Sequence, residues 1–184
     1  MDFKYETPQL IMRVCNRGDA RMVYDFYRSN LLDFAQYEPI DMKAATTLVY
    51  YESLLDIEME LLIKREVVRF FLFEKTNAFR IIGTIAFREL NLAPHMMSCM
   101  VGYKIDKRFR RRGYAREAIY TGCDVMFHDE KLHRIEATVL PDNVASSRLL
   151  EGLGFVREGL LRKKIKLNGS WRDHYLYALV NEDV

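Results

Sequence analysis

The chain has 184 residues, of which 49% are hydrophobic and 29% are charged. This composition is typical of a globular protein, so we expect a single domain over residues 1–184 and exclude a disordered chain. Lys and Arg number 28 against 26 Asp and Glu, which gives a net charge of +2. The chain therefore lacks the strong basic excess of proteins that coat nucleic acid.

The sequence carries no signal for secretion, membrane insertion or metal binding. The first residues lack the apolar segment of a signal peptide, and no run approaches the ~18 apolar residues of a membrane span. Cys15, Cys99 and Cys123 are odd in number and show no C-x-x-C spacing, which argues against disulfides and a zinc site. The histidines show no ligand spacing either. We expect a cytoplasmic protein in a reducing compartment, without a metal.

Helical spacing dominates the N-terminal third of the chain. The predicted elements there are a strand over 9–15, a helix that starts after Asn16 and includes Tyr27, an aromatic-rich break over 29–39, and a second helix over 41–64.

Short apolar runs rich in β-branched and aromatic residues begin at residue 67. The predicted elements are strands over 67–74, 80–87 and 98–105, a helix from Gly113, a strand over 133–140, a helix over 143–151, and strands over 155–167 and 170–180. Residues 75–79 suit a hairpin turn, and Asn168-Gly169 is a strong signal for another. The order β-α-α-β-β-β-α-β-α-β-β predicts a mixed α/β (α+β) domain. Its sheet has about seven strands, mostly antiparallel, and four helices accompany it.

The most informative segment runs from Tyr103 to Ala115. It is a strand, a loop with several arginines, Gly113, and then a helix. Unpaired N–H groups and the dipole of a helix N-terminus attract anions, and a glycine there lets a ligand approach the backbone. The segment predicts a pyrophosphate site. A solvated basic loop and a nucleic-acid patch remain as alternatives, whereas the glycines of a P-loop or a Rossmann site are missing.

The motif Arg110-x-x-Gly113-x-Ala115 resembles the acetyl-CoA signature of the GNAT N-acetyltransferase superfamily. The resemblance covers about residues 8–180 and is greatest to the Rim-type branch, which acetylates N-terminal amines of ribosomal proteins. The further segments that carry it are IGTIAF at 82–87, VGYKID at 101–106, RIEATVLPDNVASSRLLEGLGF at 134–155 and WRDHYLY at 171–177.

The resemblance implies the GNAT fold and acetyl-CoA as the cofactor. In that fold one strand splays from the next, and its freed backbone pairs with the pantetheine arm. In this chain that stretch is Tyr103, Lys104 and Ile105. The pyrophosphate-binding backbone amides would be those of Arg110, Arg111, Arg112, Gly113, Tyr114 and Ala115, with arginine side chains adding charge. Asn143 would bind the pantetheine, cap the next helix, or do both.

The implied reaction is direct attack of a neutral amine on acetyl-CoA in a ternary complex. Leu150 stands where many relatives carry a tyrosine acid. Ser146, three residues after Asn143, matches the serine that has this role in the Rim branch, so the resemblance makes it the candidate for the leaving sulfur; a surface hydroxyl of the helix is the alternative. Met100 and Thr138 stand where relatives carry glutamate. Glu136, on the same strand face as Thr138, is therefore the candidate base; Glu89 or a chain of waters is the alternative. Cys99 and Cys123 lie in apolar segments and are not expected to act as nucleophiles.

Loops between the first two helices and the last two strands shape the acceptor pocket in similar enzymes. The candidate acceptor-binding residues are Phe34, Tyr37, Glu89, Trp171, His174 and Tyr175, with ordinary packing as the alternative for the aromatic ones.

The leading acceptor is the N-terminal α-amine of a protein, by similarity to the Rim type. A small-molecule amine is the alternative substrate, and a non-catalytic acyl-CoA-binding module is the alternative class. No membrane and no direct nucleic-acid partner are expected. Dimers are common among similar proteins, so a homodimer is left open.

Overall fold

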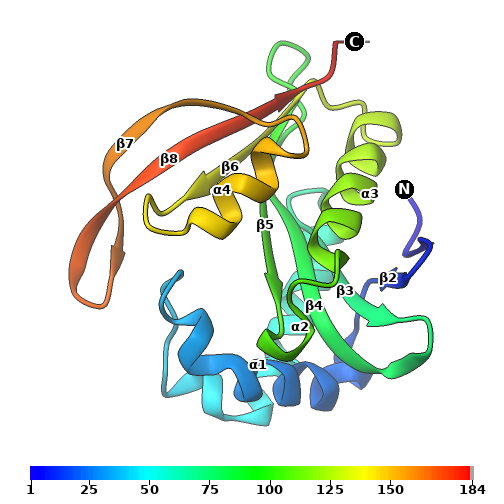
Figure 1. Ribbon diagram of the computed structural model, residues 1–184. Coiled ribbons are helices and arrows are strands. Elements are labelled where there is room, and N and C mark those ends of the chain that lie inside the picture. The colour runs from blue at the N-terminus through cyan, green and yellow to red at the C-terminus, as the bar shows by residue number, and fades with distance from the viewer. Residues whose placement is uncertain (183–184) are drawn as a thin grey trace.

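Alternating apolar residues build one twisted sheet of eight strands, and helices pack on both faces of it (Figure 1). The structure is a computed structural model that describes residues 1–182. The strands are β1 (Lys4–Glu6), β2 (Leu10–Arg13), β3 (Val68–Glu74), β4 (Asn77–Asn91), β5 (Ser98–Ile105), β6 (Arg134–Val139), β7 (Val156–Leu167) and β8 (Ser170–Val180). Their order in the sheet is β1-β2-β3-β4-β5-β6-β8-β7.

Four α-helices connect these strands. They are α1 (Ala20–Phe34), α2 (Leu48–Ile63), α3 (Tyr114–His128) and α4 (Val144–Glu151). Neighbouring strands in the described chain are antiparallel except β5 and β6, which run parallel because α3 crosses over between them. No helix among residues 1–182 is long and apolar enough to cross a membrane.

The predicted mixed sheet with four helices is confirmed, and several predicted boundaries are wrong. The second helix begins at Leu48, not at residue 41, because residues 44–46 form a separate 3-10 turn and Thr47 caps α2. The first helix continues through residue 29 to Phe34, since its aromatic residues pack into the core. The turn after β3 is shorter than predicted, so β4 already starts at Asn77. The sheet has one strand more than predicted. The additional strand is β1, which is only three residues long and lacks an apolar pattern.

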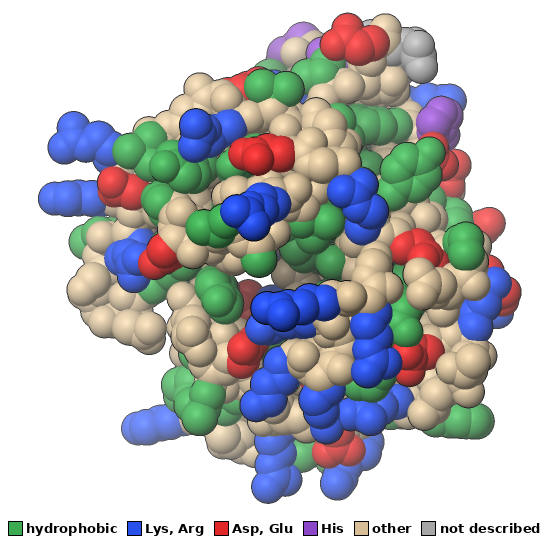
Figure 2. Space-filling view, in the orientation of Figure 1, with side chains coloured by type: hydrophobic (Ala, Val, Ile, Leu, Met, Phe, Trp, Pro, Cys, Tyr) green, Lys and Arg blue, Asp and Glu red, His purple; other side chains and the backbone are tan. Residues whose placement is uncertain are grey.

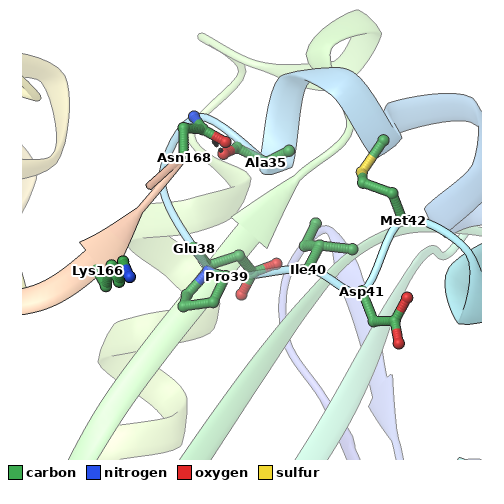
Figure 3. A pocket seen from close by; sticks show the side chains of 8 residues that line it. All are labelled: Ala35, Glu38, Pro39, Ile40, Asp41, Met42, Lys166 and Asn168. Atoms are coloured by element: carbon green, nitrogen blue, oxygen red, sulfur yellow. Dashed lines mark hydrogen bonds between the residues drawn. The ribbon is translucent and has the colours of Figure 1, made fainter. Parts of the chain in front are cut away.

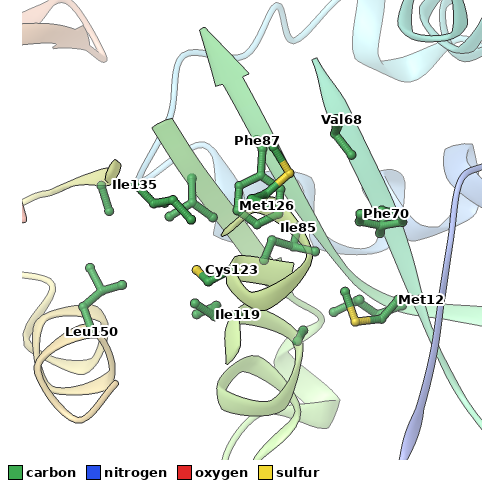
Figure 4. Packing of buried hydrophobic residues seen from close by; sticks show 14 of the residues in the cluster. Met12, Val68, Phe70, Ile85, Phe87, Ile119, Cys123, Met126, Ile135 and Leu150 are labelled. Carbon is green, nitrogen blue, oxygen red and sulfur yellow. The ribbon is translucent and has the colours of Figure 1, made fainter. Parts of the chain in front are cut away.

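Alternate residues of each central strand face different helices. Phe70 and Leu72 of β3 point into a core shared with α3 and α4, whereas Phe71 and Phe73 pack against α1 and α2. Figure 4 shows the first of these cores, in which side chains of α3 meet Ile85 and Phe87 of β4. The face covered by α1 and α2 and the face covered by α3 and α4 can thus be assigned residue by residue.

Helix α3 lies unusually close to β4 at Gly122. A Cβ built on Gly122 would lie 2.9 Å from the Phe87 Cζ and 3.1 Å from the Ile85 Cδ1, and both of these side chains are fully buried. Because interiors are close-packed, neither side chain has free space to move into. The absence of a side chain at residue 122 therefore sets the distance between α3 and the sheet.

We expect Gly122→Val to lower the free energy of unfolding by about 1–3 kcal/mol, because it overpacks this contact. Gly159→Val on β7 is the matched control, since a Cβ at residue 159 has no atom within 4 Å. Urea denaturation of both variants checks the prediction. Equal stability of the two variants would contradict it.

Candidate active site

The pairing between β5 and β6 stops after three residue pairs. Ser98, Cys99 and Met100 pair with Arg134, Ile135 and Glu136. Beyond Met100, β6 continues beside β8 while residues 101–105 of β5 pair with β4 alone (Figure 1). In the described chain this leaves one edge of β5 without a strand partner, so its N–H and C=O groups are open to an added strand. The expected splay is therefore present at Tyr103, Lys104 and Ile105.

Helix α3 begins where this open edge ends. Gly113 precedes its first residue with a φ of +86°, and no side chain caps the helix. The left-handed conformation favours glycine, and the uncapped first turn leaves N–H groups for an anion. Lys and Arg side chains gather over the β5–α3 loop, below a hollow that separates them from α4 (Figure 2). The geometry is that of a phosphate-binding helix start.

Most of the charged and polar side chains of this loop already have protein partners. Arg110 forms an ion pair with Asp33 of α1. Arg112 donates to the Arg108 carbonyl at 3.3 Å. The ring of Tyr114 is buried and its hydroxyl donates to Glu74 at 2.5 Å. These side chains hold the loop in place, which leaves the backbone amides and the exposed Arg111 to face a ligand.

Tyr103 of β5 and Ser146 of α4 meet at the mouth of the splay. Their hydroxyl oxygens are 2.5 Å apart. Burial raises the pKa of Tyr103 to about 12, so its phenol stays protonated at neutral pH and can donate to Ser146 Oγ. The proton of Ser146 is then free for another acceptor. Asn143 caps α4 and accepts a hydrogen bond from the Ser146 N–H at 3.2 Å.

The candidate base Glu136 is held by an arginine. Arg134 Nε donates to Glu136 Oε1 at 2.8 Å, and the same guanidinium also pairs with Glu158 of β7. Thr138 lies two residues along on the same face of β6. Glu89 is exposed and sits at an irregularity of β4 with a φ of +55°.

Two of the predicted acceptor-binding residues are buried, so their side chains are not exposed to an acceptor. Phe34 is 3% exposed and packs among the aromatic residues of α1. His174 is 2% exposed, and burial lowers its pKa. Tyr37 and Trp171 are exposed, and Tyr175 lies under the guanidinium of Arg157.

The loop between α1 and α2 and the tip of the β7–β8 hairpin enclose a hollow of about 390 Å³ (Figure 3). Asn168 of the hairpin turn donates to the Ala35 carbonyl at 3.5 Å, which joins the two segments. Glu38 lines the hollow and pairs with Lys104 Nζ at 2.6 Å. Because Lys104 also lies over Tyr27 of α1, the hollow opens on the α1 and α2 face of β5. This is the face opposite the α4 contact of Tyr103.

The cysteines offer no nucleophile for an acetylated intermediate. All three are buried, and burial raises the pKa of the Cys99 thiol to about 12 and that of Cys123 further. Thiols of this kind stay protonated at neutral pH, and the protonated form is unreactive. Residues 1–182 also contain no group of three or more His, Cys, Asp or Glu side chains that could hold a metal ion.

Sequence reasoning missed two contacts: the approach of Arg88 of β4 to Gly102 of β5, where a Cβ would lie 3.0 Å from Arg88 Nη2, and the pair between Glu38 and Lys104. Gly102 was the available signal for the first contact, since a glycine inside a strand often marks the close approach of another group. The Glu38–Lys104 pair joins a loop to a strand far away in the chain, so no local pattern could have predicted it.

The comparisons with known proteins agree with this geometry. The family model described as "Acetyltransferase (GNAT) domain" matches residues 9–156. The chain is 41% identical over 104 residues to the "Probable N-acetyltransferase YjcK" of Bacillus subtilis (strain 168). That match covers 56% of this chain and 57% of the relative, so the matched part spans little more than half of YjcK.

Two solved structures resemble the chain over nearly its whole length. The ribosomal-protein-S5-alanine acetyltransferase of Vibrio fischeri has a TM-score of 0.92 and 30% identity, and the match covers 99% of this chain and 98% of that one. Mycobacterium smegmatis RimJ, solved in complex with CoA-disulfide, has a TM-score of 0.87 and 25% identity, with 95% and 83% covered.

The chain therefore belongs to the GNAT acetyltransferase family. It is an N-acetyltransferase whose acyl donor is acetyl-CoA, related to enzymes that modify ribosomal proteins. The open edge of β5 and the uncapped start of α3 fit this donor, because they offer backbone groups for its amides and phosphates.

We expect Gly113→Glu to abolish acetyl-CoA binding, because it adds negative charge and a strained residue where the phosphates would lie. Gly169→Glu is the matched control: Gly169 also has a left-handed φ, of +83°, but lies in the β7–β8 turn. Calorimetric titration with acetyl-CoA checks the prediction. Unchanged affinity of the Gly113 variant would contradict the placement of the phosphates.

Proposed function

We propose that the chain acetylates the N-terminal α-amine of a protein, with ribosomal proteins as the acceptor class. One observation carries the proposal: the strands that flank the splay offer no carboxylate free to act as a base on the acceptor face. By the family resemblance, Met100 stands where many Rim-type sequences carry glutamate and Thr138 where some relatives do, and Glu136 is paired with Arg134. Such a site favours an amine that is already partly neutral.

The ordinary pKa values of amines decide between the acceptor classes. An α-amine has a pKa of about 7.7–8.0 and a lysine ε-amine about 10.4. At pH 7.5 roughly a third of α-amines are neutral, against roughly one in a thousand lysine side chains. A site without a strong base can therefore acetylate an α-amine, whereas an alkyl amine stays almost entirely protonated and cannot attack. The similarity to the ribosomal-protein-S5-alanine acetyltransferase of Vibrio fischeri supports the same acceptor class.

The donor supplies the acetyl group, and this chain's residues hold and orient it. The free edge of β5 over residues 101–105 would bind the pantetheine amides, and the first turn of α3 would bind the pyrophosphate. Backbone N–H groups of β5 would also polarise the reacting carbonyl. Asn143 orders the start of α4 and so positions Ser146.

Ser146 would donate a hydrogen bond to the sulfur that leaves and keep its own proton, because a serine hydroxyl is a weaker acid than a thiol; the thiolate would take its proton from water. The Tyr103 and Ser146 hydroxyls are 2.5 Å apart, and either one can be the donor. When Tyr103 donates, the serine proton is free to point to the sulfur. Glu136, oriented by Arg134, would hydrogen-bond the incoming amine on the opposite face. The proton of the amine would leave to water, since Glu136 and Glu38 are each paired with a cation.

An acetylation assay tests the acceptor class. The enzyme is incubated with acetyl-CoA and a peptide that has a free N-terminal alanine and one internal lysine, and the modified residue is located by mass spectrometry. The expected product carries a single acetyl group at its N-terminus. A peptide with a blocked N-terminus is the control. Acetylation of the lysine, or of spermidine alone, would contradict the proposal.

We expect Ser146→Ala to lower kcat by roughly tenfold or more with little change in the KM for acetyl-CoA, because the lost hydroxyl acts on the leaving sulfur. Ser147→Ala is the matched control, since the neighbouring hydroxyl is directed to Tyr177 instead. Steady-state kinetics of both variants check the prediction. An unchanged kcat would remove Ser146 from the reaction.

A further inference from the structure

Four cationic side chains from β3 to β6 lie on the face of the sheet that α1 and α2 cover, which is the face on which the hollow beside the β7–β8 hairpin opens. Three of them are neutralised by carboxylates. The pairs are Arg69–Glu58 at 2.6 Å, Lys104–Glu38 at 2.6 Å and Arg134–Glu136 at 2.8 Å. The fourth is Arg88 of β4, which has no carboxylate partner within residues 1–182. Glu158 of β7 also pairs with Arg134, so the four cations are matched in number by four carboxylates, yet Arg88 is the member of this set that no carboxylate of residues 1–182 contacts.

Arg88 lies at the point where β5 and β6 separate. It is opposite Met100 of β5, and Met100 is opposite Glu136 of β6, the last pair before the splay. The three residues form one row across three strands and share a face. The guanidinium is therefore next to the place where the donor thioester and the acceptor amine have to meet.

Gly102 creates the space that the guanidinium occupies. A Cβ on Gly102 would lie 3.0 Å from Arg88 Nη2 and 3.8 Å from Cζ. The guanidinium thus lies across β5, over the second residue past the last β6 pair. Arg88 is exposed overall, so a ligand can reach its outer N–H groups.

A guanidinium in this position suits an acceptor with an oxygen close to its amine. Its planar set of donors matches carbonyl and carboxylate oxygens and cannot accept a hydrogen bond from an ammonium group. In a peptide N-terminus the first carbonyl is two bonds from the nitrogen, whereas a polyamine offers only further positive charges. A like charge also favours the neutral form of a nearby amine, which is the form that attacks.

We infer that Arg88 is a specificity-determining residue that binds the first carbonyl oxygen of an acceptor peptide and excludes polycationic amines. The inference rests on the proposed function and deepens it, because it states why an α-amino-acyl group is chosen over an alkyl amine. Gly102 is part of the same proposed contact site, since its lack of a side chain allows the Arg88 guanidinium to lie over β5.

Kinetics and binding of two acceptors test the inference. Arg88→Gln, Arg88→Lys and the control Arg21→Gln, a surface arginine of α1 paired with Asp25, are each assayed with a lysine-free peptide amide that begins with alanine and with spermidine. Calorimetric titration of the peptide into enzyme saturated with CoA gives its Kd without turnover.

Arg88→Gln should raise the KM and Kd of the peptide by roughly tenfold or more, the usual effect of losing a hydrogen bond to a charged group. The KM for acetyl-CoA should stay the same, and spermidine should be used no worse than before. Arg88→Lys should lie between the wild type and Arg88→Gln, because it keeps the charge and loses the planar donors. Gly102→Ala should weaken peptide binding in the same direction by displacing the guanidinium.

Two failures are distinguishable. A wild-type enzyme that acetylates spermidine and not the peptide would refute the proposed function itself. A wild-type enzyme that prefers the peptide, together with an Arg88→Gln variant that keeps the same peptide KM and Kd, would refute only the role of Arg88. An equal loss for both acceptors would also overturn it, since a charge-selective contact cannot weaken both alike.

Discussion

The separation of β6 from β5 after Met100 is the constraint on which the rest of the site depends. An unpaired strand edge is normally a liability, because its N–H and C=O groups invite aggregation. Here the proposed partner of the open edge is acetyl-CoA, whose amides can pair with it. The parallel relation of the two strands requires a crossover, and the crossover helix α3 starts where the open edge ends. One topological feature thus supplies both the strand-like and the phosphate-binding half of the donor site.

Charge pairing then divides the two faces of the sheet between donor and acceptor. On the donor face Tyr103 and Ser146 share a hydrogen bond above the splay. On the acceptor face Lys104 and Arg134 are each paired with a carboxylate. These pairs occupy the acidic groups that could have served as a base. Under the proposed function, such a site would depend on the intrinsic acidity of the amine that it receives, so its ion pairs would bear on the class of acceptor.

Local patterns in the sequence predicted the strand-loop-helix framework around Gly113, because its residues are adjacent in the chain. The donor-binding roles of these residues stay predictions, and the packing around the proposed acceptor region was predicted less well. The start of α2 was predicted too early because the apolar spacing is the same whether residues 44–46 form a 3-10 turn or the first turn of an α-helix. Phe34 and His174 were expected near the acceptor because of their place in segments that shape the acceptor pocket in similar enzymes, yet both are buried by packing between distant elements. Arg88 was missed because its approach to Gly102, and its place in one row with Met100 and Glu136, arise only in the sheet.

The ion pair between Arg110 and Asp33 connects the β5–α3 loop, where the phosphates are proposed to bind, to the last turn of α1. The segment that follows α1 lines the hollow beside the β7–β8 hairpin, so one helix end is shared by the two proposed binding regions. Asp33 lies near a helix C-terminus, where a carboxylate is unfavourable unless a cation offsets it. Any anion that draws Arg110 away therefore changes the stability of that helix end. Thermodynamic linkage makes the effect mutual. If an acceptor orders the same segment and changes the affinity for the donor by some factor, the donor changes the affinity for the acceptor by the same factor.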